Sequence, residues 1–231
     1  MQRDVQPLGP PYPVNETFES LQGEAQYTGT PAVFIRMQGC PVGCPWCDTK
    51  HTWDINSDRE VSVDVMGAKT EVPVDTFAWC DVATLARIVG AADIEHVVIT
   101  GGEPCQYDLR PLIETLEAAG HRVQVETSGT YRPFITRHTF LTVSPKYSMP
   151  GGRPVLAEAL LRADEFKYPV GRQTDIETVL DYLQPIHLER NTPIWLQPLS
   201  LSTRATGICI EAAHRFDWRV SLQTHKFISI R

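Results

Sequence analysis

Three closely spaced cysteines are the residues in this chain whose types and spacing most clearly indicate chemistry. Cys40, Cys44 and Cys47 occur in the run GCPVGCPWCDT, with the spacing C-x3-C-x2-C. Thiolates this close can bind one metal centre, but a structural zinc site normally has four protein ligands, and the nearest further candidate is His51. An iron–sulfur cube also normally takes four cysteines. With three cysteines, one iron keeps a position open for a ligand that is not protein.

The composition excludes several classes of protein. The 231 residues include 21 basic and 28 acidic side chains, so the formal net charge is −7, which argues against a general nucleic-acid binder. A hydrophobic content of 42% is too high for a disordered chain. The first residues contain no apolar stretch and no run approaches the length of a transmembrane helix, so we expect a cytoplasmic protein without a membrane partner. In a reducing compartment, clustered thiols indicate a metal or redox centre.

The elements that must position these thiols follow from the hydrophobic pattern. Short apolar strands alternate with amphipathic helices, which indicates parallel βα units. The pattern predicts seven strands, at residues 32–39, 96–100, 122–127, 140–143, 165–170, 193–199 and 219–225. Thr174 and Glu177 are spaced as a capping box that opens a helix. Seven strands are too few for a complete eight-unit barrel, so an open doubly wound sheet or an incomplete barrel remains, with the site at the carboxyl ends of the strands.

We predict a single domain over residues 1–231. Four of the first thirteen residues are prolines, so residues 1–14 are expected to form an extended arm. Residues 52–77 are polar and without clear periodicity, and we expect a variable insertion or irregular connection there. No functional residue is assigned to residues 54–77.

Two motifs together resemble the radical S-adenosylmethionine superfamily. The first is the cysteine spacing, with the aromatic Trp46 before the last cysteine, and the second is TGGEP at residues 100–104, which ends the next strand. In that superfamily the three cysteines hold a [4Fe-4S] cluster, whose open iron binds the amino and carboxylate groups of S-adenosyl-L-methionine. Electron transfer from the cluster then yields a 5′-deoxyadenosyl radical. The resemblance implies an α/β fold, an incomplete (βα) barrel of about six parallel strands.

The chain is further similar, from Asn15 onward, to the 7-carboxy-7-deazaguanine synthase family. The motifs that carry this similarity are NETFESLQGE, FIRMQGCPVGCPWCDTKHTW, VVITGGEP, VETSGT, VSPK, LQPL and QTHKFISI. One departure is Ala25, because the family usually continues QGE with glycine. The resemblance implies a carbon–nitrogen lyase that converts 6-carboxy-5,6,7,8-tetrahydropterin to 7-carboxy-7-deazaguanine with release of ammonia, in 7-deazapurine (queuosine precursor) biosynthesis.

The same resemblance implies roles for individual residues. The cluster ligands are Cys40, Cys44 and Cys47, and the hydroxyl of Thr49 binds Mg²⁺ beside the substrate. The residues implied to bind the cosubstrate are Trp46, Cys47, Asp48, Gly102, Glu103, Ser144, Pro145, Lys146, Gln197, Pro198, Leu199 and Ser200. Those implied to bind the substrate are Leu21, Gln22, Gly23, Glu24, Arg36, Thr100, Glu126, His225 and Arg231, the last through its backbone carboxylate. No catalytic side chain is assigned, because the cluster and the radical carry the chemistry. Cys80, Cys105 and Cys209 match no role and are expected to be buried or neutral thiols.

The sequence also suggests binding partners, and it leaves other functions open. The resemblance implies a homodimer and a reductant such as flavodoxin, and no nucleic acid is expected. One alternative is an activase that removes hydrogen from a glycine of a partner protein. Another is an electron carrier or a zinc protein, with His51 as fourth ligand. Simpler interpretations also remain for single features. Thr49 could be a loop hydroxyl and Glu126 a surface cap. Arg36 could be a snorkelling edge residue, and GGEP a plain turn.

Overall fold

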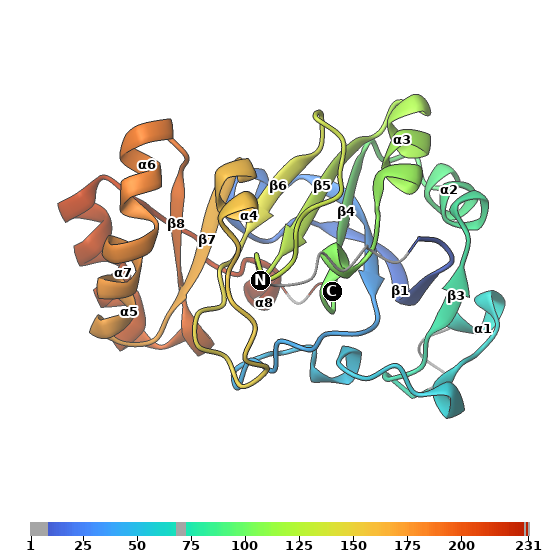
Figure 1. Cartoon of the computed structure of the whole chain (residues 1–231), viewed down its shortest axis with the longest axis horizontal. Coiled ribbons are helices and arrows are strands. Elements are labelled where there is room, and N and C mark those ends of the chain that lie inside the picture. Colours follow the sequence, from blue (N-terminus) through green and yellow to red (C-terminus); the bar gives the residue numbers. More distant parts are fainter. Residues whose placement is uncertain (1–8, 68–72, 229, 231) are drawn as a thin grey trace.

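The chain folds into one strongly curved sheet with helices on its outside (Figure 1). The computed structural model describes residues 9–67, 73–228 and 230, and Arg231, predicted to bind substrate, lies outside them. Nine strands of the described chain pair in the order β3-β1-β2-β4-β5-β6-β7-β8-β9. All pairings from β2 to β9 are parallel, whereas β1 pairs antiparallel with both β2 and β3. The predicted incomplete barrel of parallel strands is therefore confirmed.

The bounds of the elements are as follows. The strands are β1 (Tyr12–Leu21), β2 (Pro31–Met37), β3 (Ala78–Cys80), β4 (His96–Gly101), β5 (Arg122–Thr127), β6 (Phe140–Val143), β7 (Glu165–Val170), β8 (Ile194–Pro198) and β9 (Arg219–Val220). The α-helices are α1 (Val63–Gly67), α2 (Val82–Gly90), α3 (Arg110–Ala118), α4 (Ala157–Arg162), α5 (Gln173–Tyr182), α6 (Gln184–Arg190), α7 (Thr203–Phe216) and α8 (His225–Ile228). Single 3-10 turns are η1 (Ala25–Tyr27), η2 (Lys50–Thr52), η3 (Ser57–Arg59), η4 (Pro104–Gln106) and η5 (Leu199–Leu201).

Side chains alternate between the two faces of the sheet, as the period of a strand requires. The outward positions are apolar and pack against the helices, as with Ile35, Ile99, Val125, Phe166 and Leu196. The inward positions are mostly polar and face the enclosed lumen, as with Arg36, Thr100, Glu126, Lys167 and Gln197. The outer apolar layer holds the barrel together, and the lumen is left for polar contacts.

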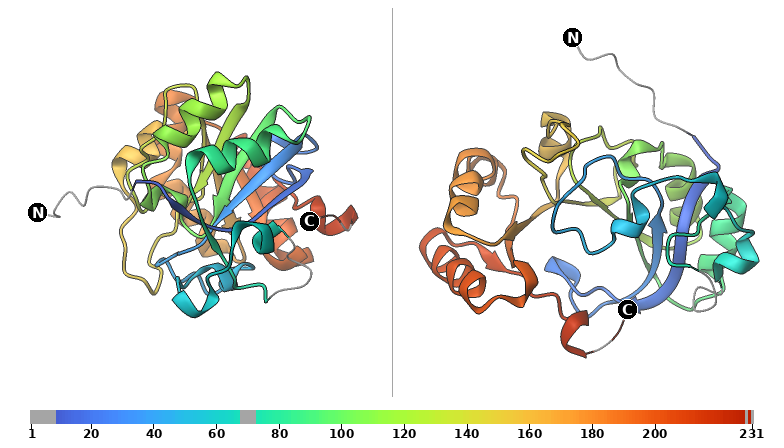
Figure 2. Two further views of the ribbon diagram at one scale, coloured as in Figure 1. Left: turned by 90° about the vertical axis from the view of Figure 1, so that its right-hand side faces the viewer. Right: turned by 90° about the horizontal axis from the view of Figure 1, so that it is seen from below.

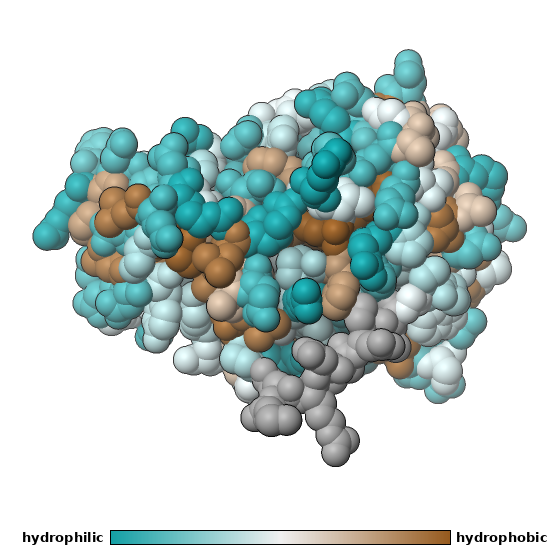
Figure 3. Space-filling view, turned by 45° about the horizontal axis from the view of Figure 1, so that its top comes forward, coloured by the Kyte–Doolittle hydropathy of each residue, from teal (hydrophilic) through white to brown (hydrophobic). Residues whose placement is uncertain are grey.

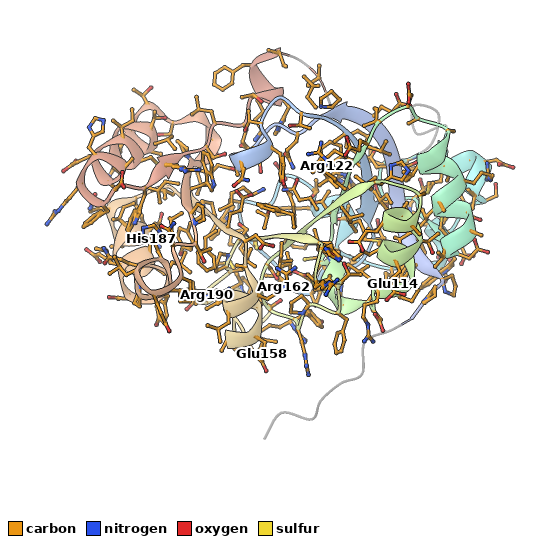
Figure 4. The ribbon with its side chains drawn as sticks, turned by 90° about the horizontal axis from the view of Figure 1, so that it is seen from above. Glu114, Arg122, Glu158, Arg162, His187 and Arg190 are labelled. Carbon is orange, nitrogen blue, oxygen red and sulfur yellow. The ribbon has the colours of Figure 1, made fainter. Side chains whose placement is uncertain are left out.

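The helices cover the outside of the sheet. Seen from below, they lie around the curved strands (Figure 2), and their outer surfaces are largely hydrophilic (Figure 3). The charged side chains of Glu114, Glu158 and Arg190, for example, come from the outer helices α3, α4 and α6 (Figure 4). None of the helices in the described ranges is long and apolar enough to cross a membrane.

The N-terminal part of the sheet differs from the prediction. Residues 1–14 were expected as an arm, but β1 begins at Tyr12, and the polar run NETFES continues this strand. In the structure, Glu16 and Phe18 of β1 lie opposite Arg36 and Phe34 of β2, so one face of β1 carries both charged and apolar side chains. This mixture hides the alternation of polar and apolar residues by which a strand is predicted. Within 52–77 the described residues form η3 and α1, and residues 68–72 lie outside the description.

Two predicted boundaries are also wrong. Helix α5 begins at Gln173, so Thr174 lies inside its first turn, and the cap is made by Asp175, whose carboxylate accepts from the N–H groups of Gly171 and Arg172 at 2.8 and 3.0 Å. The last predicted strand, 219–225, ends at Val220, because the following residues turn back toward the lumen and open α8. His225 thus begins a helix rather than ending a strand.

Candidate active site

One cavity of about 410 Å³ opens at the carboxyl ends of the parallel strands and reaches into the lumen. Its lining includes the loop that carries the three cysteines and the residues that end β4, β5 and β6. Deeper inside, it is lined by polar side chains of the lumen. The size lies in the usual range for sites that bind small molecules.

The cysteine loop, residues 40–47, follows β2 directly. Gly39 and Gly43, with φ of 95° and 72°, allow the chain to enter and turn within the loop. The N–H of Cys47 donates to the carbonyl of Cys44 at 3.0 Å, and all three thiols are free and line the cavity. Within the described ranges, no three His, Cys, Asp or Glu side chains converge closely enough for a single metal ion. Three thiols on one cavity are the ligand set that a cluster with one open iron would need.

The charge of the loop depends on whether a metal is bound. Burial raises the pKa of Cys40 to about 12 and also raises the pKa of Cys44, so these two thiols are neutral without a metal. Lys146 is half-buried near Cys44 and donates from Nζ to the carbonyl of Ser144 at 2.8 Å. Burial lowers the pKa of this lysine, while the nearby Cys44 opposes that shift. Positively charged irons would stabilise the thiolates that ligation requires.

The GGEP segment joins the ends of β2 and β5. Gly102 and Glu103 donate backbone hydrogen bonds to the carbonyls of Met37 and Gly39, at 2.9 and 2.8 Å. A Cβ at Gly102 would lie against the backbone of Gly39, well inside van der Waals contact. The carboxylate of Glu103 is buried and accepts hydrogen bonds from Thr127 Oγ1 at 2.6 Å and from the N–H of Ser128 at 2.8 Å. This segment is therefore a rigid edge of the cavity rather than a plain turn.

A second group of polar side chains, which we name the lumen cluster, lies deeper in the cavity. Its members are Gln22, Glu24, Glu126, Lys167, Gln197 and Gln223. Lys167 donates from Nζ to Glu24 and, at 3.2 Å, to Glu126. The amides of Gln197 and Gln223 donate to Glu24 Oε1 at 3.2 and 2.8 Å.

The other carboxylate of the lumen cluster is held in a similar way. Glu126 accepts from the amide of Gln22 at 3.1 Å and from the hydroxyl of Thr100 at 3.1 Å. These bonds come from the hairpin after β1 and from the end of β4. They fix the carboxylate inside the cavity, where only 19% of the Glu126 side chain is exposed, so it is not a surface cap.

The charges of the lumen cluster depend on one another. Burial alone would raise the pKa of Glu24, but Lys167 and the hydrogen bonds from Lys167 and Gln223 lower it to about 2. Burial alone would lower the pKa of Lys167, but Glu126 and Glu24 raise it. Two carboxylates and one ammonium give the group a formal charge of −1. This arrangement presents oriented acceptors to a ligand that carries N–H donors.

Comparisons with known proteins agree with the geometry. No family model matches the chain. It is 49% identical over 221 residues to the 7-carboxy-7-deazaguanine synthase of Escherichia coli strain K12, covering 95% of this chain and 99% of that one. It is 39% identical over 224 residues to the protein of the same name from Buchnera aphidicola subsp. Schizaphis graminum, covering 95% and 99%. The crystal structure of QueE from Escherichia coli superposes with a TM-score of 0.88 at 50% identity, covering 93% of this chain and 94% of that one.

This chain belongs to the 7-carboxy-7-deazaguanine synthase family. The identity extends along both chains almost from end to end, so the cysteine loop and the strands around it are compared as a unit. The family resemblance predicted from the sequence is confirmed.

The structure places most of the residues implied by the family resemblance around the one cavity. Those that line it are Leu21, Gln22, Gly23, Glu24, Arg36, Cys40, Cys44, Trp46, Cys47, Asp48, Thr49, Thr100, Gly102, Glu103, Glu126, Ser144, Lys146, Gln197, Leu199, Ser200 and His225. Pro145 and Pro198 do not line it. These residues come from positions 21 to 225, so the fold brings together segments that are far apart in the sequence.

Two of these residues have contacts that the family motifs did not indicate. Arg36 donates from Nε to Glu16 at 2.8 Å, and its guanidinium lies over the ring of Phe18 at 5.4 Å. It therefore faces the cavity while bound to the neighbouring strand. The ring of His225 lies against Gly23, where a Cβ would overlap Nδ1. Only glycine at position 23 lets α8 approach this hairpin so closely.

Within the lumen cluster, Lys167 and Gln223 were given no individual binding role by sequence reasoning, although Lys167 was counted among the basic groups near strand ends that could face an anionic substrate, and Gln223 opens the QTHKFISI motif. Lys167 lies in the run EFKYPV, where Glu165 and Lys167 share one face and Phe166 and Tyr168 share the other. The same alternation holds for Gln124 and Glu126 in β5. Polar residues two positions apart in an apolar strand therefore indicate side chains that share the inward face. Gln223 gave no such signal, because it lies between β9 and α8.

Proposed function

We propose that this chain converts 6-carboxy-5,6,7,8-tetrahydropterin to 7-carboxy-7-deazaguanine with release of ammonia, as a carbon–nitrogen lyase that supplies a queuosine precursor. The observation that carries the proposal is the single cavity that joins a three-cysteine loop to a buried set of hydrogen-bonding groups. Family membership adds the identity of the reaction. We take the chain to act as one domain.

The cysteine loop would hold the [4Fe-4S] cluster. Cys40, Cys44 and Cys47 would be its ligands, and the cluster with S-adenosyl-L-methionine would supply the radical that removes hydrogen from C6 of the pterin. The chain's own contribution here is positional. The rigid GGEP edge and the segment after β6, with Ser144 and Lys146, border the space beside the loop, where the cosubstrate would bind. A cavity shielded by the loop also limits access of water to a reactive intermediate.

The lumen cluster would hold the pterin. The 2-amino group and ring N–H groups of a pterin are donors, and Glu24 and Glu126 are fixed acceptors in the cavity. The substrate carboxylate needs a partner that donates hydrogen bonds, and Arg36 on β2 and His225 on α8 both line the cavity. Holding C6 close to the cosubstrate is worth more than any single contact, because misplacement loses the advantage of proximity.

A magnesium site is proposed at Thr49. Its hydroxyl lines the cavity next to the cysteine loop, 3.5 Å from Cys47 Sγ. A hard cation prefers oxygen ligands, so this hydroxyl and substrate oxygens are a suitable set. Replacing Thr49 with valine should remove magnesium stimulation of turnover, while Thr49→Ser should keep it. Equal stimulation in wild type and both variants would leave Thr49 as a simple loop hydroxyl.

The remaining partners are proposed from the family match. We expect a homodimer, which light scattering of the reconstituted protein would test against a monomer. We expect a flavodoxin-type reductant, which should support turnover as dithionite does.

One experiment tests the proposed reaction itself. The reconstituted protein is incubated without oxygen with 6-carboxytetrahydropterin, S-adenosyl-L-methionine, magnesium and reductant, and the products are analysed by mass. We expect 7-carboxy-7-deazaguanine and ammonia in equal amounts. Formation of 5′-deoxyadenosine only in the presence of a partner protein would favour an activase. Failure to bind S-adenosyl-L-methionine after reconstitution would favour an electron carrier or a zinc protein.

A further inference from the structure

Lys167 is a buried cation that the family motifs leave without a role. It lies on β7, and only 8% of its side chain is exposed. Its ammonium lies between two carboxylates that come from distant parts of the chain, Glu24 in the hairpin after β1 and Glu126 on β5. A lysine is almost never this buried without a partner, so its position is tied to these two acids.

The surroundings of Lys167 hold it in that position. Glu165, two residues earlier on the same face of β7, accepts from Thr142 Oγ1 at 2.8 Å and from the N–H of Gln26 at 3.2 Å. Thr142 in turn accepts from the amide of Gln124 at 2.9 Å, whose oxygen contacts His96 Nε2 at 2.9 Å. This chain of hydrogen bonds crosses four neighbouring strands beneath the lumen cluster. It fixes the register of β5, β6 and β7, and with it the distance between Lys167 and Glu126.

We infer that Lys167 is a positioning residue, which keeps Glu24 and Glu126 charged and at a fixed separation so that both accept hydrogen bonds from the N–H groups of a pterin. The inference rests on the proposed function, since it assigns the lumen cluster to the substrate. The ammonium has two partners within the protein and acts on the substrate through them. Lys167 is therefore distinct from the residues that would touch the substrate.

The physical reason is that two buried carboxylates cannot both remain ionised without a nearby cation. Without Lys167, one of them would take up a proton at neutral pH and lose an acceptor oxygen. Other charged or titratable groups around the cavity are Arg36 on β2, the three thiols and Asp48 of the segment after β2, Glu103 after β4, Lys146 after β6, Glu165 on β7, and His225 and Lys226 on α8. Arg36 contacts Glu16, Lys146 contacts Ser144, and Lys226 contacts Gln223 and, at 3.8 Å, Asp48. These three cations have other contacts, which leaves Lys167 as the cation in contact with both acids.

The test compares Lys167→Met and Lys167→Arg with wild type in the reconstituted holoenzyme. Binding of 6-carboxypterin, a non-reacting probe, is followed by its fluorescence from about pH 6 to about pH 8.5, beside kcat/KM for the tetrahydropterin. We expect Lys167→Met to bind at least about tenfold more weakly at the acid end, and to regain affinity as the pH rises and the carboxylates ionise. Lys167→Arg should restore the pH profile of the wild type. An equal loss of affinity at every pH would mean that Lys167 serves only the fold, and would overturn the inference.

A second measurement decides the question if Lys167→Met does not fold. Infrared difference spectra of the wild-type holoenzyme over the same pH range should contain no protonated-carboxyl band that disappears in Glu24→Gln or Glu126→Gln. Such a band would show that one acid is neutral beside Lys167, and the inference would be wrong. Product formation by the wild type is measured in the same series. If the wild type binds the probe but makes no 7-carboxy-7-deazaguanine, the proposed function fails while the role of Lys167 is still decided by the pH profile.

Discussion

The cysteine loop and the lumen cluster line the same cavity, but the chain builds them in different ways. The loop occupies residues 40–47, and its shape depends on two glycines and mostly on hydrogen bonds to near neighbours, with one distant bond from the N–H of Gly151 to the carbonyl of Val42 at 3.1 Å. The lumen cluster joins side chains as far apart as Glu24 and Gln223, which are 199 positions apart in sequence. A local motif can be recognised by its spacing alone. A cluster of this kind exists only when every strand around it has the correct register.

The two regions also differ in what stabilises them. Burial leaves the thiols of Cys40 and Cys44 neutral, so these two groups need a metal to become charged. The lumen cluster carries its charges without a ligand, because Lys167 lies between Glu24 and Glu126. We therefore expect changes in the loop to abolish activity with little effect on folding, and changes around the cluster to affect stability and substrate binding together.

The largest effect is expected from Cys44→Ala. Removing one of three thiolate ligands should abolish cluster assembly and turnover, while the chain remains folded. Iron content, the visible absorption of the cluster and circular dichroism measure these quantities after anaerobic reconstitution. The matched control is Cys209→Ala, which removes a buried thiol of α7 and should keep full iron content. An intact [4Fe-4S] signal in Cys44→Ala would disprove the ligand assignment.

The next effect separates the two regions directly. In Gly102→Ala, the new Cβ meets the backbone of Gly39, which must shift, so the unfolding free energy should fall by about 2 kcal/mol. Cosubstrate affinity should fall at least about tenfold, while binding of 6-carboxypterin to the lumen cluster changes little. The control Gly207→Ala has no heavy atom within 4 Å of the new Cβ and should stabilise α7 by about 0.5–1 kcal/mol. Equal losses of both ligands would contradict the separation of loop and cluster.

A smaller effect tests the layer beneath the lumen cluster. Burial raises the pKa of Glu165 to about 7, so its contribution to stability is complete below about pH 4.5 and is lost as the pH rises through about 7. As the pH rises from about 6 to about 8, the ionisation of Glu165 should lower the unfolding free energy of the wild type by about 1 kcal/mol. Urea denaturation of Glu165→Gln should show a correspondingly flatter profile. The control Glu158→Gln, at an exposed site of α4, should keep the wild-type slope, and equal slopes in all three proteins would contradict the assignment.

The smallest effect is a gain of stability. Ala25 follows the QGE motif where the family usually has glycine, and its φ of 52° lies in the left-handed region. A Cβ in that conformation costs about 1–2 kcal/mol, so Ala25→Gly should raise the unfolding free energy by roughly 1 kcal/mol after the entropic cost of glycine. Urea denaturation measures the change. The control Ala157→Gly, at an exposed helical site, should be destabilised. Destabilisation of both variants would show that position 25 is not strained.

The sequence predicted the cysteine loop well because its chemistry lies in consecutive residues. Strands β2, β4, β5, β6, β7 and β8 were also predicted within about two residues at each end, since their outward faces are apolar. Strand β1 was missed because its inward face mixes charge and aromatic residues, which hides the period of two. The fold class followed from the order of strands and helices, while the antiparallel edge did not.

The lumen cluster could be predicted only in part. Glu24 and Glu126 were found through family motifs, but nothing local indicates that Lys167 lies between them. Its role depends on the parallel register of β5, β6 and β7, which the sequence does not display. The prediction that His225 ends a strand was wrong for a similar reason. The chain after β9 turns toward the hairpin at Gly23 and contacts it, and the sequence does not display this long-range contact.

The central claim is that the two regions act on one substrate, with the pterin in the lumen cluster and C6 directed toward the cysteine loop. The most direct test uses 6-carboxytetrahydropterin with deuterium at C6, incubated with the reconstituted protein, S-adenosyl-L-methionine, magnesium and reductant. The account predicts that product forms and that deuterium is recovered in S-adenosyl-L-methionine or 5′-deoxyadenosine. Product formation with no deuterium in either compound would contradict it, because the hydrogen removed would then not be the one at C6.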